Sequence, residues 1–282
     1  MNSAPCAKSR HHRLRVFMGG ALTGILFFGP AAAQDASWTL HPGLHDRWTI
    51  ELGAYAPTVK TDARLDSPTL GIGTAVSFED DLGLSDRKTM GTFLGRVRLG
   101  ERWRIEAEYF ALDRGSTGSI SRTINWGGNV YTPGTVVTSE FNSDIFRLSA
   151  GYSFIKNAQS ELGLALGLHV TDFTASLGAA SVGVKTGDAL APLPTIGLYG
   201  AYAFTPRWLL SGRVDYFSLK YNEYDGSLTN FSAGVDYRFH RHFGVGVGYR
   251  YIDYGLDATK SNFTGSLQYQ FSGPLLYGVG SF

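Results

Sequence analysis

The stretch from Thr89 to Arg114 constrains the fold more than any other part of the chain. Apolar and polar residues alternate through two segments, 91–99 and 103–111, on either side of Gly100-Glu101. Side chains on a β-strand point to opposite faces with a period of two, so each segment is predicted to be a strand with one apolar and one charged face. A short connection that contains glycine suits a hairpin turn, and the Arg and Glu side chains then share one face, where opposite charges can pair.

Two environments produce such a hairpin. In a soluble sandwich the apolar face is the core, whereas in a membrane barrel it meets lipid and the charged face lines the lumen. The chain has 282 residues, a formal net charge of +1 and 36 glycines. No stretch after the start has 18 consecutive apolar residues, so a transmembrane helix is not expected there, and the composition favours a large antiparallel β structure.

The first 33 residues are predicted to be a secretory signal peptide. Four basic residues without an acid precede the apolar run 16–28, and Ala31-Ala32-Ala33 supplies a small-residue cleavage site. The alternative is a short membrane anchor, for which the apolar run is too short. Cleavage removes Cys6, the one cysteine, and leaves 21 basic against 24 acidic residues, a net charge of −3. The mature chain therefore has no basic surface for nucleic acid.

The remaining residues divide into a periplasmic N-terminal lead, 34–45, expected to be loosely ordered, and a barrel, 46–282. Ten alternating segments in the barrel are predicted to be strands; eight is the alternative, because the last three are rich in glycine and weakly specified in register. The predicted strands are 48–56, 91–99, 103–111, 146–154, 162–171, 196–204, 208–217, 231–238, 243–251 and 267–282. The predicted long polar loops are 61–87, 115–140 and 178–191, and the second can contain extensions of the neighbouring strands.

Connection lengths and aromatic positions favour the membrane barrel. Tight turns alternate with longer polar connections, and both chain ends fall on the short-turn side, which is the periplasmic side in bacterial outer-membrane barrels. Aromatic residues gather at the two ends of the apolar faces, as the girdles of such barrels do. The two rows are Trp48, Trp103, Tyr152, Phe154, Phe204, Trp208, Tyr237 and Phe243, and Tyr109, Tyr216, Tyr249 and Tyr251.

The signal peptide, the alternating strands, the girdles and the terminal Phe282 resemble small Gram-negative outer-membrane β-barrels of the OmpA/OmpW-like superfamily. The resemblance covers residues 46–282 in pattern and implies an all-β antiparallel transmembrane barrel in the Gram-negative outer membrane. It also implies two partners, the outer-membrane lipids and the barrel assembly machinery, which reads a C-terminal aromatic such as Phe282. The alternation of Leu267, Tyr269 and Phe271 is out of phase with Phe282, so a bulge near Ser281 is expected to bring both onto the lipid face.

The inward faces of the predicted strands carry charges of both signs. We interpret them as a salt-bridge network that fills the lumen, because small barrels have lumens about as wide as their side chains. A charge-lined selective channel is the alternative. The predicted network comprises Glu51, Arg96, Arg98, Arg104, Glu106, Glu108, Arg147, Arg213, Asp215, Asp236, Arg238 and Arg250.

No catalytic, cofactor or metal residues are predicted. His169 has Thr171 and Asp172 nearby but no identifiable nucleophile, so we interpret it as a hydrogen-bonded filler of the lumen. Glu79-Asp80-Asp81 lacks the ligand spacing of a calcium loop, and His240-Arg241-His242 is a turn. The function expected is a barrel without catalytic activity, structural or permitting limited passage of small solutes. The alternative is an outer-membrane enzyme acting on lipid or peptide.

Overall fold

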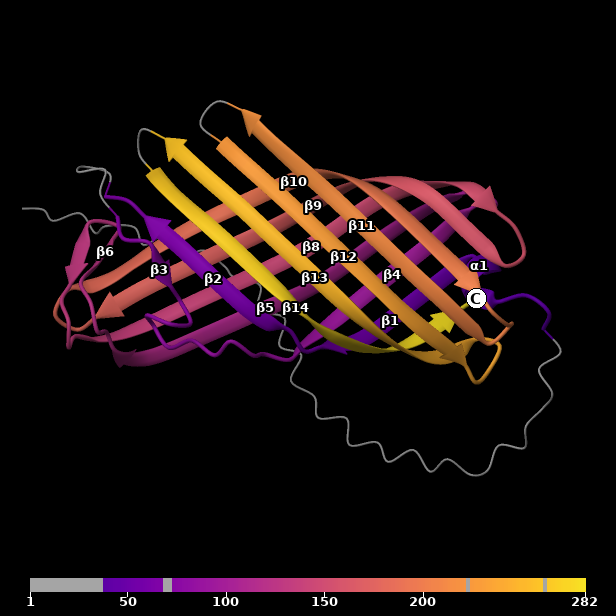
Figure 1. Cartoon of the computed structure of the whole chain (residues 1–282), viewed down its shortest axis with the longest axis horizontal. Coiled ribbons are helices and arrows are strands. Elements are labelled where there is room, and N and C mark those ends of the chain that lie inside the picture. Colours follow the sequence, from indigo (N-terminus) through magenta and orange to yellow (C-terminus); the bar gives the residue numbers. More distant parts are fainter. Residues whose placement is uncertain (1–37, 68–72, 222–223, 261–262) are drawn as a thin grey trace, which may run out of the picture. The chain divides into compact units, whose positions relative to one another are not determined.

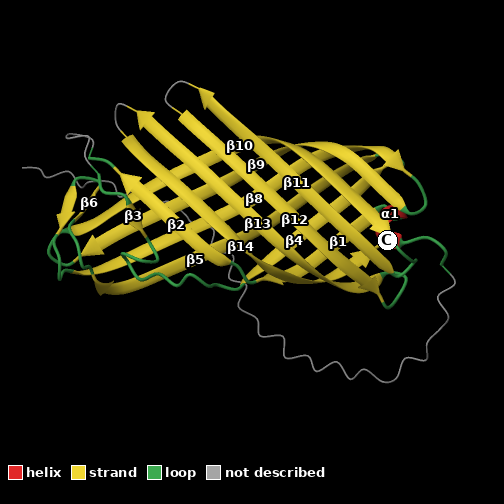
Figure 2. Cartoon of the chain, in the orientation of Figure 1, coloured by secondary structure: helices red, strands yellow, loops and turns green. Residues whose placement is uncertain are grey.

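The computed structural model describes residues 38–67, 73–221, 224–260 and 263–282. The predicted signal peptide and the first residues of the lead lie outside these ranges, and the predicted domain boundaries stay predictions. No helix among the described residues has the length and apolar character needed to cross a membrane. Strands dominate the fold (Figure 2).

One short helix and fourteen strands make up the described chain. The helix is α1 (Pro42–His45). The strands are β1 (Trp48–Tyr55), β2 (Thr58–Leu65), β3 (Val76–Ser77), β4 (Met90–Leu99), β5 (Trp103–Ser119), β6 (Ile124–Trp126), β7 (Asn129–Tyr131), β8 (Val136–Lys156), β9 (Ser160–Ala179), β10 (Gly183–Ala203), β11 (Trp208–Tyr221), β12 (Tyr224–Arg238), β13 (Phe243–Lys260) and β14 (Phe263–Ser281).

Ten of these strands close into an antiparallel barrel. Their order is β1-β4-β5-β8-β9-β10-β11-β12-β13-β14, and β14 pairs back with β1. The nearer and the more distant strands tilt in opposite senses against the long axis, as closure of a sheet requires (Figure 1). The prediction of ten strands is confirmed, and the alternative of eight is wrong.

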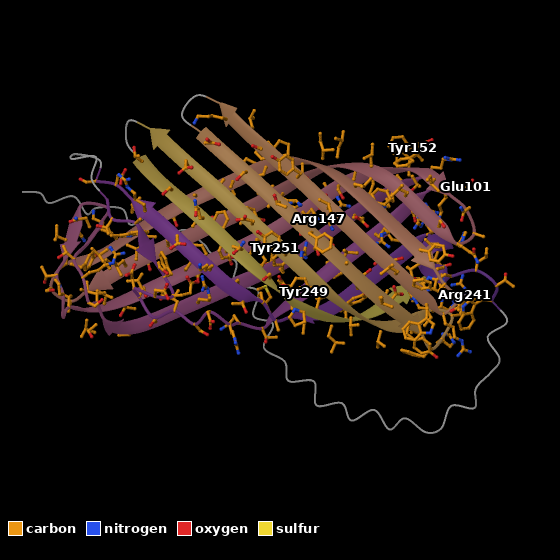
Figure 3. The ribbon with its side chains drawn as sticks, viewed as in Figure 1. Glu101, Arg147, Tyr152, Arg241, Tyr249 and Tyr251 are labelled. Atoms are coloured by element: carbon orange, nitrogen blue, oxygen red, sulfur yellow. The ribbon has the colours of Figure 1, made fainter. Side chains whose placement is uncertain are left out.

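Alternation sets the two faces of the lower barrel, the half nearest the short turns. On β5, Trp103 and Ile105 point outward and are exposed, whereas Arg104 and Glu106 are buried in the lumen. Leu166 on β9 is 70% exposed on the outer surface. Figure 3 shows Tyr152 and Glu101 near the short-turn end and Arg147 midway along the barrel. This arrangement confirms the predicted outward apolar and inward charged faces.

The upper half of the barrel reverses that pattern. On β2, the even-numbered Lys60, Asp62 and Arg64 face outward, whereas Val59 and Leu65 are buried inside. Above the lipid, a strand meets water outside, so the apolar side turns inward as it does in soluble proteins. β2 pairs with β14 from Thr58 to Leu65, and this reversal explains why its residues 61–65 were wrongly predicted to belong to a loop.

One further loop prediction about the upper half is wrong, and another is correct in part. The predicted loop 178–191 is an extended hairpin, because β9 and β10 stay paired up to Ala179 and Gly183. Gly183 has a φ of +86°, which suits the left-handed backbone of this turn. The predicted loop 115–140 contains the expected strand extensions, the ends of β5 and β8, together with the small hairpin β6–β7, which was not predicted.

The predicted bulge near Ser281 is absent from β14. The strand pairs with β13 in a continuous register from Phe263 to Gly280. Tyr269 and Phe271 are buried in the lumen, and the terminal Phe282 faces outward with 53% of its surface exposed. β14 therefore alternates between the two faces as predicted, without a bulge. Its upper apolar residues, however, point into the barrel and not to lipid.

We expect the folded protein to be heat-modifiable on SDS gels. A closed barrel has no free edge from which SDS can start to separate the strands, so the unboiled protein should stay compact and migrate differently from a boiled sample. Protein extracted from outer membrane should be compared before and after boiling, with a urea-unfolded sample as the control. Identical migration of the boiled and unboiled samples would contradict the closed barrel.

Candidate functional site: a charged layer below an aromatic layer

The twelve predicted network residues all lie in the lower half of the lumen. Ten of the twelve side chains are buried, and Glu51 and Arg96 are half-buried. Eleven of them line one small internal cavity, and Asp215 joins them through Arg213. We call this set, with the additional Glu161 described below, the charged layer.

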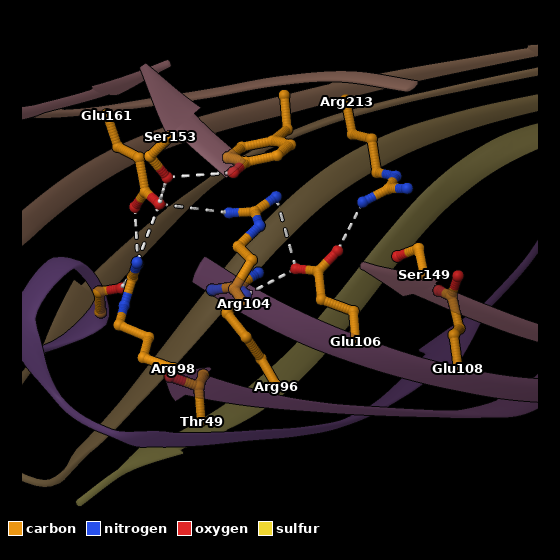
Figure 4. A network of polar contacts seen from close by, with 12 residues as sticks. Thr49, Arg96, Arg98, Arg104, Glu106, Glu108, Ser149, Ser153, Glu161 and Arg213 are labelled. Carbon is orange, nitrogen blue, oxygen red and sulfur yellow. Dashed lines mark hydrogen bonds and ion pairs between the residues drawn. The ribbon is translucent and has the colours of Figure 1, made fainter. Parts of the chain in front are cut away.

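Glu106 on β5 is the centre of the charged layer (Figure 4). Arg96 Nε on the neighbouring β4 donates to Glu106 Oε1 at 2.6 Å, and Arg213 Nη1 from β11 donates to Glu106 Oε2 at 2.6 Å. Arg104 and Arg147 each have a guanidinium nitrogen 3.5 Å from this carboxylate. Four guanidinium groups from four strands therefore converge on one carboxylate, which is how a buried charge is compensated.

Glu108 closes the layer towards the opposite wall. Arg147 Nε donates to Glu108 Oε2 at 2.9 Å, and Arg250 from β13 donates to both carboxylate oxygens at 2.6 and 2.7 Å. Asn230 links Arg250 to Asp215 through hydrogen bonds of 3.1 and 2.9 Å. The side chains thus connect strands on both sides of the lumen.

Sequence reasoning missed Glu161 and Tyr199. Glu161 accepts hydrogen bonds from Arg98 at 2.8 and 2.5 Å and from Ser153 Oγ at 2.6 Å. Its signal was present, since it is in phase with the inward Ala165, but the strand was predicted to start one residue later. The ring of Tyr199 stacks on Arg104, with 3.1 Å between the guanidinium carbon and the ring centroid. The alternation of its strand places Tyr199 on the inward face, opposite to Leu198 and Tyr202, but does not identify Arg104 as its partner.

The N-terminal lead covers the lower end of the lumen. We expected it to be loosely ordered, but α1 buries Leu44 against Leu209. Arg98 donates to the carbonyl oxygen of Gly43 at 3.1 Å. Asp46 accepts two hydrogen bonds from Arg241, at 2.5 and 2.6 Å, which raises the pKa of that guanidinium.

Acid is expected to release this lead. Burial and the nearby Arg238 lower the pKa of His41 to about 3, an effect that Asp46 only partly opposes, and His41 Nε2 lies 3.8 Å from Asp236 without a hydrogen bond. The folded pKa is below the unfolded one, so stability is complete above about pH 6.5 and falls as the pH decreases towards 3.

Limited proteolysis of the lead is the measurement that checks this pH dependence. Cleavage before Asp46 should be faster at about pH 5 than at about pH 7. The variant His41→Gln removes this buried imidazole and leaves His45 in place, so its cleavage should show a much smaller change with pH. The same pH dependence in the variant would contradict a role for His41.

The candidate catalytic and metal residues are not assembled into a site. His169 is buried with its Nε2 4.0 Å from Asp215, and neither ring nitrogen has a hydrogen-bond partner among the residues that the structure describes, so it is not the hydrogen-bonded filler that we expected. Thr171 donates instead to Tyr254 at 3.1 Å, and Asp172 faces outward. Among the described residues, no group of three or more His, Cys, Asp or Glu side chains could hold a metal ion.

Two carboxylates of the acidic loop form ion pairs with arginines. Glu79 pairs with Arg114, and Arg122 donates to both oxygens of Asp81. The hydrogen bonds from Arg122 lower the pKa of Asp81. These contacts join the loop to β5 and to the segment after it, so the carboxylates serve as structural links.

An aromatic layer lies directly above the charged layer and was not expected from the sequence. Tyr269 packs against Phe141 and Phe271 with ring centroids 5.0 Å apart in both pairs, and Phe173 lies 5.8 Å from Tyr269. Tyr254 and Tyr269 keep their hydroxyl groups hydrogen-bonded to Thr171 and Ser143, both at 3.1 Å. The layer is formed by Phe110, Phe141, Phe173, Tyr254, Tyr269 and Phe271.

Comparison with known proteins agrees with this architecture. A family model for the outer membrane protein beta-barrel domain matches residues 52–271. No curated protein sequence gives a significant match. The solved structure of the outer membrane protease OmpT from Escherichia coli is 14% identical, with a TM-score of 0.52, over 87% of this chain and 99% of that one.

Two other solved barrels match with lower structural similarity. They are the toluene transporter TodX of Pseudomonas putida (11% identity, TM-score 0.36, 86% of this chain and 92% of that one) and OprG of Pseudomonas aeruginosa (11%, 0.35, 84% and 97%). The match to OmpT, with a TM-score of 0.52, shows a shared fold, and at 14% identity it says nothing about activity. On the family match and the ten-strand barrel, this chain belongs to the outer membrane protein beta-barrel domain family and is a protein of the Gram-negative outer membrane.

Proposed function

We propose that the protein is a barrel without catalytic activity, in which the charged layer closes the lumen and permits at most limited passage of small solutes. The observation that carries this proposal is the convergence of Arg96, Arg213 and Arg250 from separate parts of the wall on the two carboxylates Glu106 and Glu108. The outer-membrane lipids are its expected surroundings. Recognition of Phe282 by the assembly machinery stays a prediction.

The space left inside the charged layer supports this proposal. The cavity there has a volume of about 110 Å³, which suits ordered water and not a solute of the size of a sugar. Arginine and carboxylate groups that pair in a fork geometry hold each other in place, so transient opening should be rare. The aromatic layer above adds a second barrier.

The alternative of an outer-membrane enzyme has less support. A hydrolase of this kind needs a nucleophile or an activated water beside a base within hydrogen-bond reach. His169 is the one histidine on an inward strand face among the described strands, and it has no such partner. The likeness to a protease concerns the fold.

Conductance and activity assays on one preparation test the proposal. Wild-type protein in planar bilayers should give small or no current steps, and liposomes that contain it should not swell in small sugars. The double variant Glu106→Gln/Glu108→Gln should increase the conductance, whereas Glu101→Gln, an exposed change in a turn, should not. A large wild-type conductance, or lipase or protease activity of the purified barrel, would overturn the proposal.

A further inference from the structure

The barrel wall is not continuous between β10 and β11. The two strands pair only from Ile196 to Ala203 on β10, opposite Tyr216 to Leu209 on β11. β10 begins much earlier, at Gly183, and β11 runs on to Tyr221. Within the described residues, the upper part of β10 therefore pairs with β9 alone.

Two prolines account for the end of this pairing. Pro192 and Pro194 keep their register with Val170 and Leu168 of β9, so the donors that proline lacks are missing on the β11 side. Proline occurs in sheets at edges for this reason. The opening is thus specified by the sequence of β10.

The opening leads into an apolar cavity above the aromatic layer. The cavity has a volume of about 570 Å³, within the roughly 300–1,000 Å³ typical of small-molecule sites. Its apolar wall is formed by Phe141, Phe173, Leu193, Phe217, Leu256 and Leu267. Leu219, which also lines it, is on the inward face of β11 and yet 53% exposed, as expected for a side chain without a partner across the opening.

The lower end of the opening lies in the lipid-facing band. Ile196, at the last β10–β11 pair, is 65% exposed beside Leu166, which is 70% exposed. Higher up, Leu190 is 67% exposed beside the outward Asp172, so the opening extends from the apolar band into the polar region. A molecule dissolved among the lipid tails can reach the cavity without crossing water.

The cavity is closed below. The rings of Phe173 and Tyr254 pack at 5.6 Å and separate it from the charged layer, whose Glu108 and Arg250 lie underneath. A molecule that enters from the side therefore has no path to the periplasmic end. The site is suited to binding and not to conduction.

Charges at the rim select the kind of molecule. Asp188, Asp225 and Asp257 border the cavity from outward positions of their strands, and Lys220 lies 3.3 Å from Asp225. Arg64, the one cationic residue in the lining, is also on an outward position and pairs with Asp66 at 2.5 Å. An anionic headgroup would lie beside these carboxylates and would lose its hydration, so anions are disfavoured. We propose that this cavity binds one neutral, apolar small molecule, which enters from the outer leaflet through the opening between β10 and β11.

Binding of two closely related dyes tests the site. The intact barrel in lipid nanodiscs should bind neutral N-phenyl-1-naphthylamine with a 1:1 stoichiometry. The increase in dye fluorescence should be saturable and should exceed that of empty nanodiscs. The anionic 8-anilino-1-naphthalenesulfonate should bind at least about tenfold more weakly. Absence of saturable binding of the neutral dye would overturn the site, and equally tight binding of the anion would overturn the proposed ligand class.

Matched tryptophan variants locate the binding. Ala191→Trp fills the cavity from β10 and should weaken neutral-dye binding at least about tenfold, whereas Ala150→Trp, on the lipid face of β8, should leave it within about twofold. Migration on unboiled gels shows whether Ala191→Trp folds. If it does not, Leu219→Trp replaces it, because this change also fills the cavity but from an exposed position. Unchanged binding in a folded cavity variant would refute the location.

The route is tested by restoring the missing donors. In Pro192→Val/Pro194→Val both residues can donate to β11, so the opening should narrow and association of the neutral dye should slow by about tenfold. An unchanged association rate would refute lateral access. These readouts do not involve the charged layer, so they can fail or succeed independently of the proposed function.

Discussion

Replacing Glu106 by Gln is expected to lower the free energy of unfolding by about 3–5 kcal/mol, the usual cost of removing one partner from a buried ion pair. Glu106 is 2% exposed, and Arg96 and Arg213 both donate to it. Gln keeps the shape but removes the charge, so these guanidinium groups would stay buried with less compensation. Denaturant unfolding of the barrel in lipid vesicles measures the change.

The control for this prediction is Glu101→Gln, which removes the same charge from an exposed turn and should change stability by less than about 1 kcal/mol. If the lumen were instead an open, water-filled pore, solvent would screen the pairs and Glu106→Gln would leave stability unchanged. Equal stability of Glu106→Gln and wild type would therefore contradict a closed charged layer.

Leu166→Arg is expected to prevent assembly of the barrel. Leu166 is 70% exposed on the outer face of β9, between Ala150 and Ile196 on the neighbouring strands. An arginine on the lipid face near the bilayer midplane costs about 2–4 kcal/mol in a barrel. The amount of unboiled, fast- or slow-migrating folded species in outer membranes, compared with wild type, measures the loss.

Ala165→Ser provides the comparison on the opposite face. Ala165 is 3% exposed, points into the lumen and pairs with Gly197, beside which Asp215 and Arg213 lie, so this variant should assemble as wild type does. Normal assembly of Leu166→Arg together with failure of Ala165→Ser would mean that the faces have been assigned the wrong way round.

The strands and the barrel could be predicted because alternation identifies an extended segment whichever side is apolar. The side itself could not be predicted in the upper half. Tyr269 and Phe271 alternate with glutamines in the same way that Phe146 and Leu148 alternate with polar residues. The first two face the lumen and the other two face outward, since the medium outside changes from lipid to water along the barrel.

The residues of the charged layer could be predicted, but their pairing could not. The hairpin predicted compensation of Arg98 by a glutamate on β5, whereas Arg98 pairs with Glu161, which is 63 residues away in the sequence. Partners across a lumen depend on strand tilt and on stagger around the whole barrel, which local alternation does not specify. The discontinuity between β10 and β11 was missed, although Pro192 and Pro194 are plain in the sequence.

The change of polarity along the barrel also fixes its height in the membrane. Asp144 and Asp172 form an outward cross-strand pair just above Phe146 and Val170. Sinking of the barrel would move these two carboxylates towards hydrocarbon, and rising would move the lower girdle, including Trp103, towards water. The outer surface that anchors the barrel thus also sets the height of the opening beside Pro194. This opening lies at the outer leaflet, where apolar molecules collect.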